Sequence, residues 1–267
     1  MKHANFAPVT TLMEEVGRQI AAWRADAAFR QLHSETDFKT EADRRAHNLI
    51  CAGLTRLFPG VLIISEESPV HDSMRPDAYW LIDPIDGTAS WYHGFDGFVT
   101  QAAYIEHRVP LFGIVHAPVS GKTWTAAQGG GARLNGKSLS MLTPSERLIV
   151  TDNTSTPHGI SQDIMALLPA TGYLESGSLG LKSVLVADGT ADLFVKDVCV
   201  RDWDLAPAAV ILQEVGGHLS LADGSSYVFD GEFEKTDGFI VARDSVLISR
   251  AVSAFAQSKK KRWSSNK

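Results

Sequence analysis

The sequence contains few cysteines, no long apolar run and no excess of positive charge. Its two cysteines, Cys51 and Cys199, lie far apart and match neither a disulfide framework nor a zinc-ligand spacing. This usage favours a reducing compartment, and with no apolar signal-type segment near Met1 we expect a cytoplasmic location. No run reaches the roughly 18 apolar residues that a membrane span requires, so we expect no membrane partner. The 25 Lys and Arg against 31 Asp and Glu give a net charge of −6, which argues against a nucleic-acid partner.

Several widespread catalytic signatures are also missing. The chain has no Gly-x-Ser-x-Gly nucleophile motif, no phosphate-binding P-loop and no dinucleotide-binding glycine fingerprint. Its nine histidines show no paired helical spacing, which argues against a histidine-based metal site. The composition is that of an ordinary globular protein, with 44% hydrophobic and 21% charged residues. A chain of 267 residues with this composition can bury a large core without disulfides.

Hydrophobic periodicity predicts a mixture of helices and strands. Helical spacing of apolar residues indicates helices at 12–23, 43–58, 161–168, 178–187 and 205–215. Short β-branched runs predict strands at 61–64, 79–82 and 148–151 and around residues 219 and 239. Three further runs with short connections, at 99–105, 111–116 and 123–126, indicate an antiparallel meander. The fold class predicted from these patterns is α+β or layered α/β.

A polar stretch around Pro144 indicates a division of the chain into two halves. We expect an N-terminal α+β half over residues 1–145, which contains most of the candidate metal ligands. A C-terminal α/β half over residues 146–258 would supply Asp204. The remaining residues, 259–267, form a basic tail that we expect to be disordered.

Acidic residues gather at the ends of predicted elements. The run Asp83 to Thr88 reads Asp-Pro-Ile-Asp-Gly-Thr and follows a strand that looks buried. Two carboxylates held so close would repel each other unless a cation lies between them, although a solvated turn is an alternative reading. Glu66-Glu67 also follows a strand, and Asp202-Trp203-Asp204 begins a helix. If these three clusters converge, their oxygen ligands favour magnesium or manganese.

At these residues the chain resembles the inositol monophosphatase family. The run Asp83 to Thr88, followed by Trp91, corresponds to the first family signature. The second, Trp-Asp with an alanine-rich helix and a closing Glu-x-Gly-Gly, extends from Trp203 to Gly217. The pair Glu66-Glu67 and the element Thr40 to Asp43 match in order and spacing. The resemblance implies the layered αβαβα sandwich of the sugar-phosphatase fold and a homodimer.

The resemblance also implies a magnesium-dependent, lithium-sensitive phosphatase that attacks a small phosphate monoester with a metal-activated water. It implies two or three Mg²⁺ ions per site, with Mn²⁺ as a possible substitute, held by Glu66, Asp83, the Ile85 carbonyl, Asp86 and Asp204. In this reading Thr88 and Asp43 orient and deprotonate the water, and Glu66 also acts in catalysis by reaching a third metal. Glu67 would support the ligands without binding metal.

The substrate contacts implied by the resemblance do not agree on one substrate. The backbone amides of Gly87 and Thr88 would face the phosphate. Gly177 and Ser178 lie in the segment that contacts the leaving group in the family, and Asp197 stands where inositol phosphatases bind ring hydroxyls. These positions favour inositol monophosphate or a related polyol or sugar phosphate. Lys182, in contrast, stands where 3'(2'),5'-bisphosphate nucleotidases of the family have lysine, so that activity is an alternative.

Two other kinds of function remain open from the sequence. The chain could be a non-catalytic regulatory member of the family that acts through protein contacts. It could also be an acidic structural protein whose clusters are surface turns. All the candidate metal-ligand carboxylates and Thr88 are present, which favours the enzyme. One departure from the family pattern is Lys39, where valine is usual.

Overall fold

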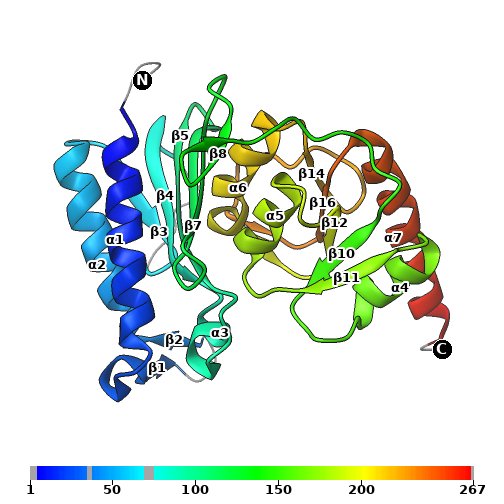
Figure 1. The fold of residues 1–267 in the computed structure, drawn as a ribbon, viewed down its shortest axis with the longest axis horizontal. Coiled ribbons are helices and arrows are strands. Elements are labelled where there is room, and N and C mark those ends of the chain that lie inside the picture. Colours follow the sequence, from blue (N-terminus) through cyan, green and yellow to red (C-terminus); the bar gives the residue numbers. More distant parts are fainter. Residues whose placement is uncertain (1–4, 35–37, 69–74, 266–267) are drawn as a thin grey trace.

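The computed structural model describes residues 5–34, 38–68 and 75–265. Figure 1 shows five layers, alternately helical and β-sheet, stacked along the long axis of the molecule. The helices of the two outer layers and the central layer are α1 (Ala7–Trp23), α2 (Glu41–Leu57), α4 (Gly159–Leu167), α5 (Leu179–Ala187), α6 (Asp202–Glu214) and α7 (Ser245–Ser265). The pair α1 and α2 covers the first sheet, α5 and α6 lie between the sheets, and α4 and α7 cover the second. The predicted αβαβα sandwich is confirmed.

The first sheet has seven strands in the order β3-β4-β5-β6-β7-β8-β9. Their bounds are β3 Leu62–Ser65, β4 Ala78–Asp86, β5 Val99–Glu106, β6 Val109–Ala117, β7 Lys122–Ala127, β8 Ala132–Leu134 and β9 Lys137–Ser138. Only β3 and β4 pair in parallel, and all later neighbours are antiparallel. The expected meander is therefore present, and β4 and β5 are adjacent strands in the interior of the sheet.

The second sheet has five strands in the order β11-β10-β12-β16-β14. Their bounds are β10 Ile149–Asp152, β11 Gly172–Glu175, β12 Leu193–Lys196, β14 His218–Leu221 and β16 Phe239–Ala242. Two short antiparallel pairs lie outside the sheets: β1 (Leu32–Ser34) with β2 (Lys39–Thr40), and β13 (Val200–Arg201) with β15 (Glu234–Lys235). A 3-10 helix (Ala27–Arg30) and α3 (Thr88–His93) complete the elements of the described chain.

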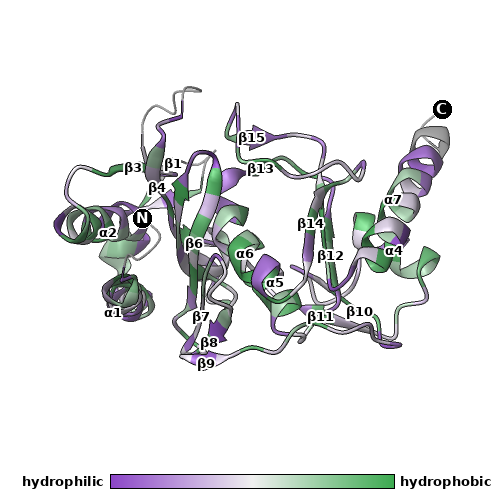
Figure 2. Ribbon diagram, turned by 90° about the horizontal axis from the view of Figure 1, so that it is seen from above, coloured by the Kyte–Doolittle hydropathy of each residue, from purple (hydrophilic) through white to green (hydrophobic). Residues whose placement is uncertain are grey.

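Helix α6 joins the two sheets into one core. It is apolar around most of its circumference, as a helix buried on opposite faces must be, and Figure 2 shows its hydrophobic residues between the sheets. One core cluster includes Val115 of the first sheet, Ile211 of α6 and Val241 of the second. The helix backbone approaches β6 closely, because a Cβ on Gly113 would lie 2.1 Å from the Pro207 carbonyl oxygen. The N-terminal half of α6 is thereby fixed against the first sheet.

The basic C-terminal segment differs from its prediction. Residues 259–265 continue α7 as helix and are not disordered, and residues 266–267 lie outside the described part. The physical reason is a contact with α4: the Arg262 Nε atom lies 2.8 Å from Asp163 Oδ2, and the Ser258 hydroxyl donates to the same oxygen. These bonds hold the basic end of α7 against the protein.

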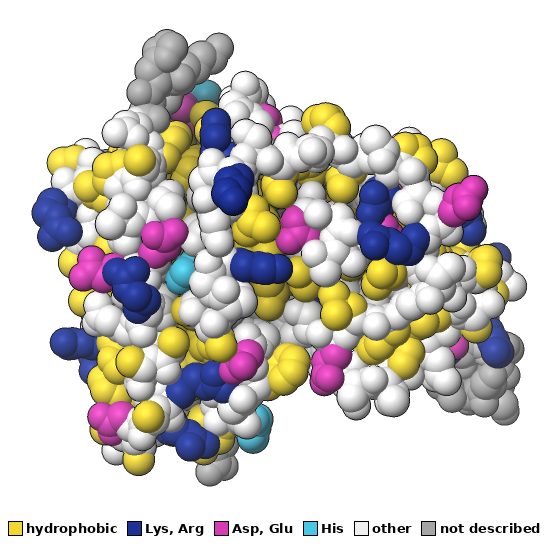
Figure 3. Space-filling view, viewed as in Figure 1, with side chains coloured by type: hydrophobic (Ala, Val, Ile, Leu, Met, Phe, Trp, Pro, Cys, Tyr) yellow, Lys and Arg dark blue, Asp and Glu magenta, His cyan; other side chains and the backbone are white. Residues whose placement is uncertain are grey.

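Two findings concern possible large partners. Among the described residues, no helix is both long enough and apolar enough to cross a bilayer. On the face in Figure 3, Lys and Arg side chains are interspersed with Asp, Glu and uncharged residues.

Candidate active site

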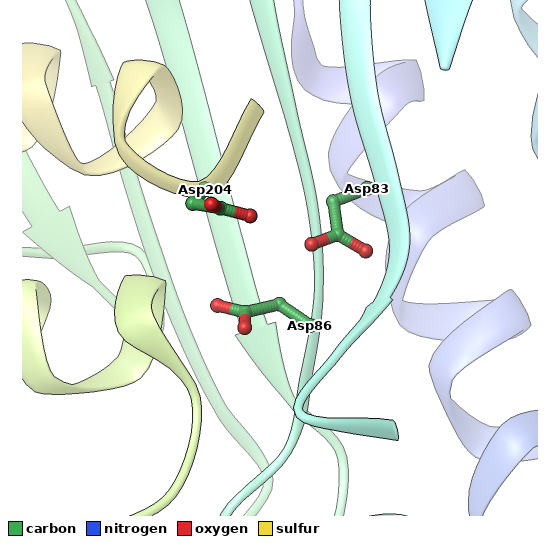
Figure 4. Close-up of side chains that lie close together, drawn as sticks. All are labelled: Asp83, Asp86 and Asp204. Atoms are coloured by element: carbon green, nitrogen blue, oxygen red, sulfur yellow. The ribbon is translucent and has the colours of Figure 1, made fainter. Parts of the chain in front are cut away.

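Three aspartates converge where β4 ends and α6 begins (Figure 4). One carboxylate oxygen from each of Asp83, Asp86 and Asp204 lies within 4.8 Å of the others. Residues three apart in a regular strand would point to opposite faces of the sheet. Here the register shifts, because Asp83 pairs with Gln101 and Asp86 with Val99, so β4 contains an extra residue. This bulge turns both carboxylates toward α6.

Asp86 is held by the start of α5. Its carboxylate accepts hydrogen bonds from the Ser178 hydroxyl, from Leu179 N at 3.2 Å and from Gly180 N at 2.7 Å. The Ser178 hydroxyl oxygen also accepts from Leu181 N at 2.9 Å and so caps the helix. Ser178 adopts this position with φ of 56°, in a left-handed region that non-glycine residues rarely occupy. Ser178 therefore links the orientation of Asp86 to α5 in the central layer.

Asp204 is held within the first turn of α6, where its Oδ2 accepts from Arg201 N at 2.8 Å. Pro207 has no N–H to donate to the Trp203 carbonyl one turn earlier. The Gln101 Nε2 atom from β5 supplies this donor at 3.1 Å, and it also lies 3.3 Å from the Asp204 carbonyl and from Asp86 Oδ2. Gln101 thus bridges two of the aspartates. Sequence reasoning missed it, although a glutamine inside an apolar strand was the available signal.

Glu66 joins the aspartates from the end of β3. Burial and the neighbouring carboxylates raise the pKa of Glu66 to about 7, and its contact with Asp83 partly offsets this rise. Burial, Glu66, Asp86 and Asp204 together raise the pKa of Asp83 well above its usual value. The pKa values of Asp86 and Asp204 are also raised, with burial as the largest cause. Four neighbouring carboxylates, of which Asp83 and Asp86 are buried and Glu66 and Asp204 half-buried, are therefore in a high-energy arrangement when they are all ionised.

The residues fit one or more hard divalent cations. Asp83 Oδ1 is buried, and among the described residues no hydrogen-bond donor reaches it. A buried anion without a donor is costly, whereas a cation would satisfy it and reduce the repulsion among its neighbours. The ligand atoms are all oxygens, which suit magnesium or manganese and not zinc. The predicted ligands Glu66, Asp83, Asp86 and Asp204 thus lie in one cluster.

A second constellation lies beside this cluster. The Thr88 hydroxyl lies 2.9 Å from Asp43 Oδ1 and 2.9 Å from the Ile85 carbonyl, so it can donate its proton to either. Asp43 Oδ2 accepts from Thr40 N at 2.8 Å and from the Thr40 hydroxyl at 2.5 Å, which fixes the carboxylate at the start of α2. Burial raises the pKa of Asp43 to about 6, while the Thr40 and Thr88 bonds act against the rise. At neutral pH Asp43 is mostly ionised and can accept a proton.

Close backbone packing unites the turn after Asp86 with the segment before α5. Gly87 has φ of 91°, and a Cβ there would lie 2.9 Å from the Gly97 carbonyl oxygen. A Cβ on Gly177 would lie 2.1 Å from the same oxygen. Only glycine permits these approaches, which place the predicted phosphate-facing and leaving-group segments side by side.

Other predicted residues lie in different surroundings. Asp197 faces α7, with its Oδ2 3.6 Å from Arg262 and 3.9 Å from Lys259. The ammonium of Lys182 is buried, donates to the Ser176 carbonyl at 3.3 Å and lies over the Phe194 ring. Burial lowers the pKa of Lys182 to about 8. Neither residue lines the main cavity beside Glu66, and their roles in substrate binding stay predictions.

Two more charged residues have partners outside the aspartate cluster. Glu67 pairs with Lys39, whose Nζ lies 3.4 Å from Glu67 Oε1 and donates to the Glu66 carbonyl at 3.0 Å. Lys39 thereby holds the end of β3 in place. Asp202 was grouped with Asp204 by sequence, but its carboxylate pairs with Arg75. The acidic run at the start of α6 therefore contributes only Asp204 to the cluster of three aspartates.

A cavity of about 760 Å³ adjoins the carboxylates. Its lining comes from both halves of the chain and comprises Lys39, Glu66, Glu67, Ser68, Arg201, Trp203, Glu232, Phe233, Glu234 and Thr236. The volume suits a small organic molecule. Four glutamates against one lysine and one arginine make the lining acidic. An anionic substrate would therefore need cations to bind here.

Comparisons with known proteins identify the family of the chain. The model of the inositol monophosphatase family matches residues 6–262. The chain belongs to this family. A fructose-1,6-bisphosphatase/inositol-1-monophosphatase of Thermotoga maritima is 31% identical over 217 residues, which are 76% of this chain and 79% of that protein. A 3'(2'),5'-bisphosphate nucleotidase CysQ of Aggregatibacter actinomycetemcomitans is 28% identical over 218 residues, covering 78% of this chain and 81% of that protein.

Solved structures of this family have the same fold as the chain. The Thermotoga maritima IMPase aligns with a TM-score of 0.79 and 25% identity, over 95% of this chain and 97% of that one. As a member of the inositol monophosphatase family, the chain is a phosphoric monoester hydrolase. The family is metal-dependent and acts on small phosphate monoesters, and the aspartate cluster is the matching feature here.

The raised carboxylate pKa values predict an unusual pH dependence of stability for this family member when metal is removed. Unfolded Asp and Glu titrate near about 3.9 and 4.3. In the folded protein the pKa of Asp43 is about 6 and that of Glu66 about 7, so the folded state retains protons that the unfolded state has released. Stability from these groups is complete below about pH 4 and is lost as the pH rises through about 7.

The melting temperature of EDTA-treated protein should therefore fall between pH 5.5 and pH 8. Added Mg²⁺ should raise it more at pH 8 than at pH 5.5, because cations and protons compete for the same oxygens. Differential scanning fluorimetry at constant ionic strength measures both effects. A melting temperature that rises steadily with pH in EDTA would contradict the prediction.

Proposed function

We propose that this chain is a Mg²⁺-dependent phosphatase that hydrolyses inositol monophosphate or a related polyol or sugar monophosphate. The observation that carries the proposal is the convergence of Glu66, Asp83, Asp86 and Asp204 beside a hydrogen-bonded Thr88–Asp43 pair. These groups come from β4, α2, α3, α6 and the residue after β3. Hydrogen bonds fix the orientation of Asp43, Asp86 and Asp204. Such an arrangement suits a dianionic phosphate only with metal ions present.

Two or three Mg²⁺ ions, or Mn²⁺ in their place, would offset the charge of the phosphate and of the carboxylates and would supply Lewis-acid chemistry. Glu66, Asp83, Asp86, Asp204 and the Ile85 carbonyl would hold them. The protein itself provides a proton path: Thr88 can pass its hydroxyl proton to Asp43 and accept one from an attacking water. The Gly87–Thr88 amides would face the phosphate beside this pair. In-line attack by the water would invert the configuration at phosphorus.

The charge of the cavity favours a neutral leaving group. Glu66, Glu67, Glu232 and Glu234 outnumber Lys39 and Arg201 in its lining. A hydroxyl-rich ring can donate hydrogen bonds to those glutamates, whereas a second phosphate would be repelled by those not neutralised by metal. The alternative is 3'(2'),5'-bisphosphate nucleotidase activity, supported by Lys182 and by the name of the Aggregatibacter relative.

Phosphate release from a small substrate panel separates the two activities. The panel contains inositol 1-phosphate, 3'-phosphoadenosine 5'-phosphate, fructose 1,6-bisphosphate and histidinol phosphate, each with Mg²⁺ and with EDTA. We expect the highest kcat/KM for inositol 1-phosphate and no turnover in EDTA. A preference for the bisphosphate nucleotide would favour the alternative, and Lys182→Met should then raise its KM more than that of inositol 1-phosphate. Turnover that survives EDTA would contradict metal dependence.

A homodimer, implied by the family resemblance, is part of the proposal. Sedimentation equilibrium gives the mass of the assembly, which should be twice the 29.0 kDa of the chain. A mass equal to that of the single chain would exclude the dimer. The proposed activity does not depend on this outcome, because every residue assigned to the site belongs to one chain.

A further inference from the structure

A buried ion pair lies beside the metal-ligand cluster, and the proposed chemistry does not use it. Arg75 and Asp202 form this pair, and neither side chain has exposed surface. The Tyr227 hydroxyl donates to Asp202 Oδ1 at 2.8 Å, and the Lys235 ammonium lies 3.8 Å from Oδ2. The guanidinium also donates to the Tyr79 hydroxyl at 3.1 Å. Replacing a buried ion pair by apolar side chains is often neutral or even stabilising, so stability alone does not account for a pair with this many hydrogen bonds.

Arg75 fixes one wall of the cavity. Its Nε donates to the Gly231 carbonyl at 2.9 Å, and its Nη2 donates to the Glu232 carbonyl at 3.1 Å. The guanidinium carbon lies 4.0 Å from the centre of the Phe233 ring. Glu232 and Phe233 both line the cavity. The position of this wall therefore depends on a side chain that comes from the segment before β4.

Asp202 fixes the start of α6. It is the first residue of the helix, and the ligand Asp204 follows two residues later. The Asp202 N–H donates to the Phe233 carbonyl at 2.9 Å, and the β13–β15 pair lies beside α6 in Figure 2. One planar guanidinium thus holds the helix start and the cavity wall together. Lysine could keep the charge, but it could not form this set of directed bonds.

We propose that Arg75 and Asp202 are a positioning pair that sets the orientation of Asp204 and the place of the 231–233 wall. The expected change in metal affinity depends only on the aspartate cluster. The expected change in substrate KM rests on the proposed function. Groups that orient metal ligands typically change metal affinity by about 10- to 100-fold when they are removed. Asp202→Asn should accordingly weaken Mn²⁺ binding about 10-fold. Arg75→Lys should weaken it similarly and also raise the substrate KM more than it lowers kcat.

Electron paramagnetic resonance of free Mn²⁺ measures the affinity with the metal alone and needs no turnover. This readout stays valid if the phosphatase assignment fails, so the two proposals can be refuted separately. Tyr227→Phe removes one hydrogen bond to Asp202 and leaves the ion pair intact. It should weaken Mn²⁺ binding about threefold, and it provides the test if the larger changes prevent folding.

The matched control is the buried pair of Arg243 and Asp192, whose Nε–Oδ1 distance is 2.6 Å. Its other contacts are with Ile149, Thr143, Gly189 and Arg147, none of which belongs to the site. Asp192→Asn should lower the melting temperature but leave Mn²⁺ affinity within twofold of the parent. If Asp202→Asn, or Tyr227→Phe in its place, behaves like Asp192→Asn, the pair is only structural and the proposal is overturned.

Discussion

Asp83→Asn is expected to abolish turnover and metal binding while the protein remains folded. Asp83 is fully buried between Glu66, Asp86 and Asp204, so its carboxylate is the centre of the cluster. Loss of a supporting group already costs about 10- to 100-fold in metal affinity, and a direct ligand should cost on the order of 10³-fold or more in kcat/KM. Phosphate release and Mn²⁺ titration measure the two losses.

The same substitution should stabilise the metal-free protein. It replaces a buried carboxylate, one oxygen of which has no donor among the described residues, by a neutral amide of the same shape. In EDTA the melting temperature of Asp83→Asn should therefore exceed that of the parent at pH 8, and added Mg²⁺ should no longer raise it. Asp223→Asn, a change at an exposed turn, is the control and should leave both quantities unaltered. If Asp83→Asn retained the stabilisation by Mg²⁺, the central position of Asp83 would be refuted.

Thr88→Ala should reduce kcat by about 10² to 10⁴-fold, the usual contribution of general acid–base groups, without a large change in metal affinity. The hydroxyl lies 2.9 Å from Asp43, so its removal interrupts the proposed proton path. Thr88→Ser keeps the hydroxyl and should recover most of the activity. If Thr88→Ala weakened Mn²⁺ binding but kept its turnover at saturating metal, the hydroxyl would orient a metal ligand and would not take part in proton transfer.

The pH profile separates the role of Asp43 from a structural one. The pKa of Asp43 is raised to about 6, so kcat should fall as the pH drops through about 6 and the carboxylate becomes protonated. Asp43→Asn should remove this limb and also lower kcat, while the amide can still cap α2. Stopped assays from pH 5 to pH 8 at saturating Mg²⁺ provide the comparison. If kcat of Asp43→Asn still fell as the pH dropped through about 6, the protonation of another group would be the cause.

Much of the fold was accessible from local patterns. Periodicity located α2 and the antiparallel strands β5, β6 and β7 within two residues of their observed bounds, and it located α1 except for its first five residues. These elements have clean apolar stripes and clear glycine or proline ends. The helix α7 was missed, although Leu247, Ala251 and Phe255 recur at helical spacing and are buried in the core. Only its last turns are rich in Lys and Ser. These last turns are held by the hydrogen bond from Arg262 to Asp163 of α4, and the two residues are 99 positions apart in the sequence.

The part of the site whose residues are neighbours in the sequence could be predicted from motifs. Asp83, Asp86, Gly87 and Thr88 lie in one run, and their grouping needed only the bulge in β4. Gln101 and Arg75 gave no motif, because each acts through partners on α6 that are about a hundred residues away or more. The two acidic residues in the first turn of α6 could not be told apart by spacing, and only the family resemblance pointed to Asp204. In the structure Asp204 joins the aspartate cluster and Asp202 pairs with Arg75.

The amino-acid sequence by itself determined the family, the alternation of helices and strands and the set of carboxylates, because these depend on residue type and on short-range order. The tertiary structure decided which carboxylates share one space and how strongly their pKa values rise, because burial and mutual repulsion depend on distances across several elements. It also decided that Asp197 faces α7 and that the ammonium of Lys182 is buried. A position in the chain specifies a side chain's chemistry, but only the packing of α5, α6 and the two sheets specifies what that side chain meets.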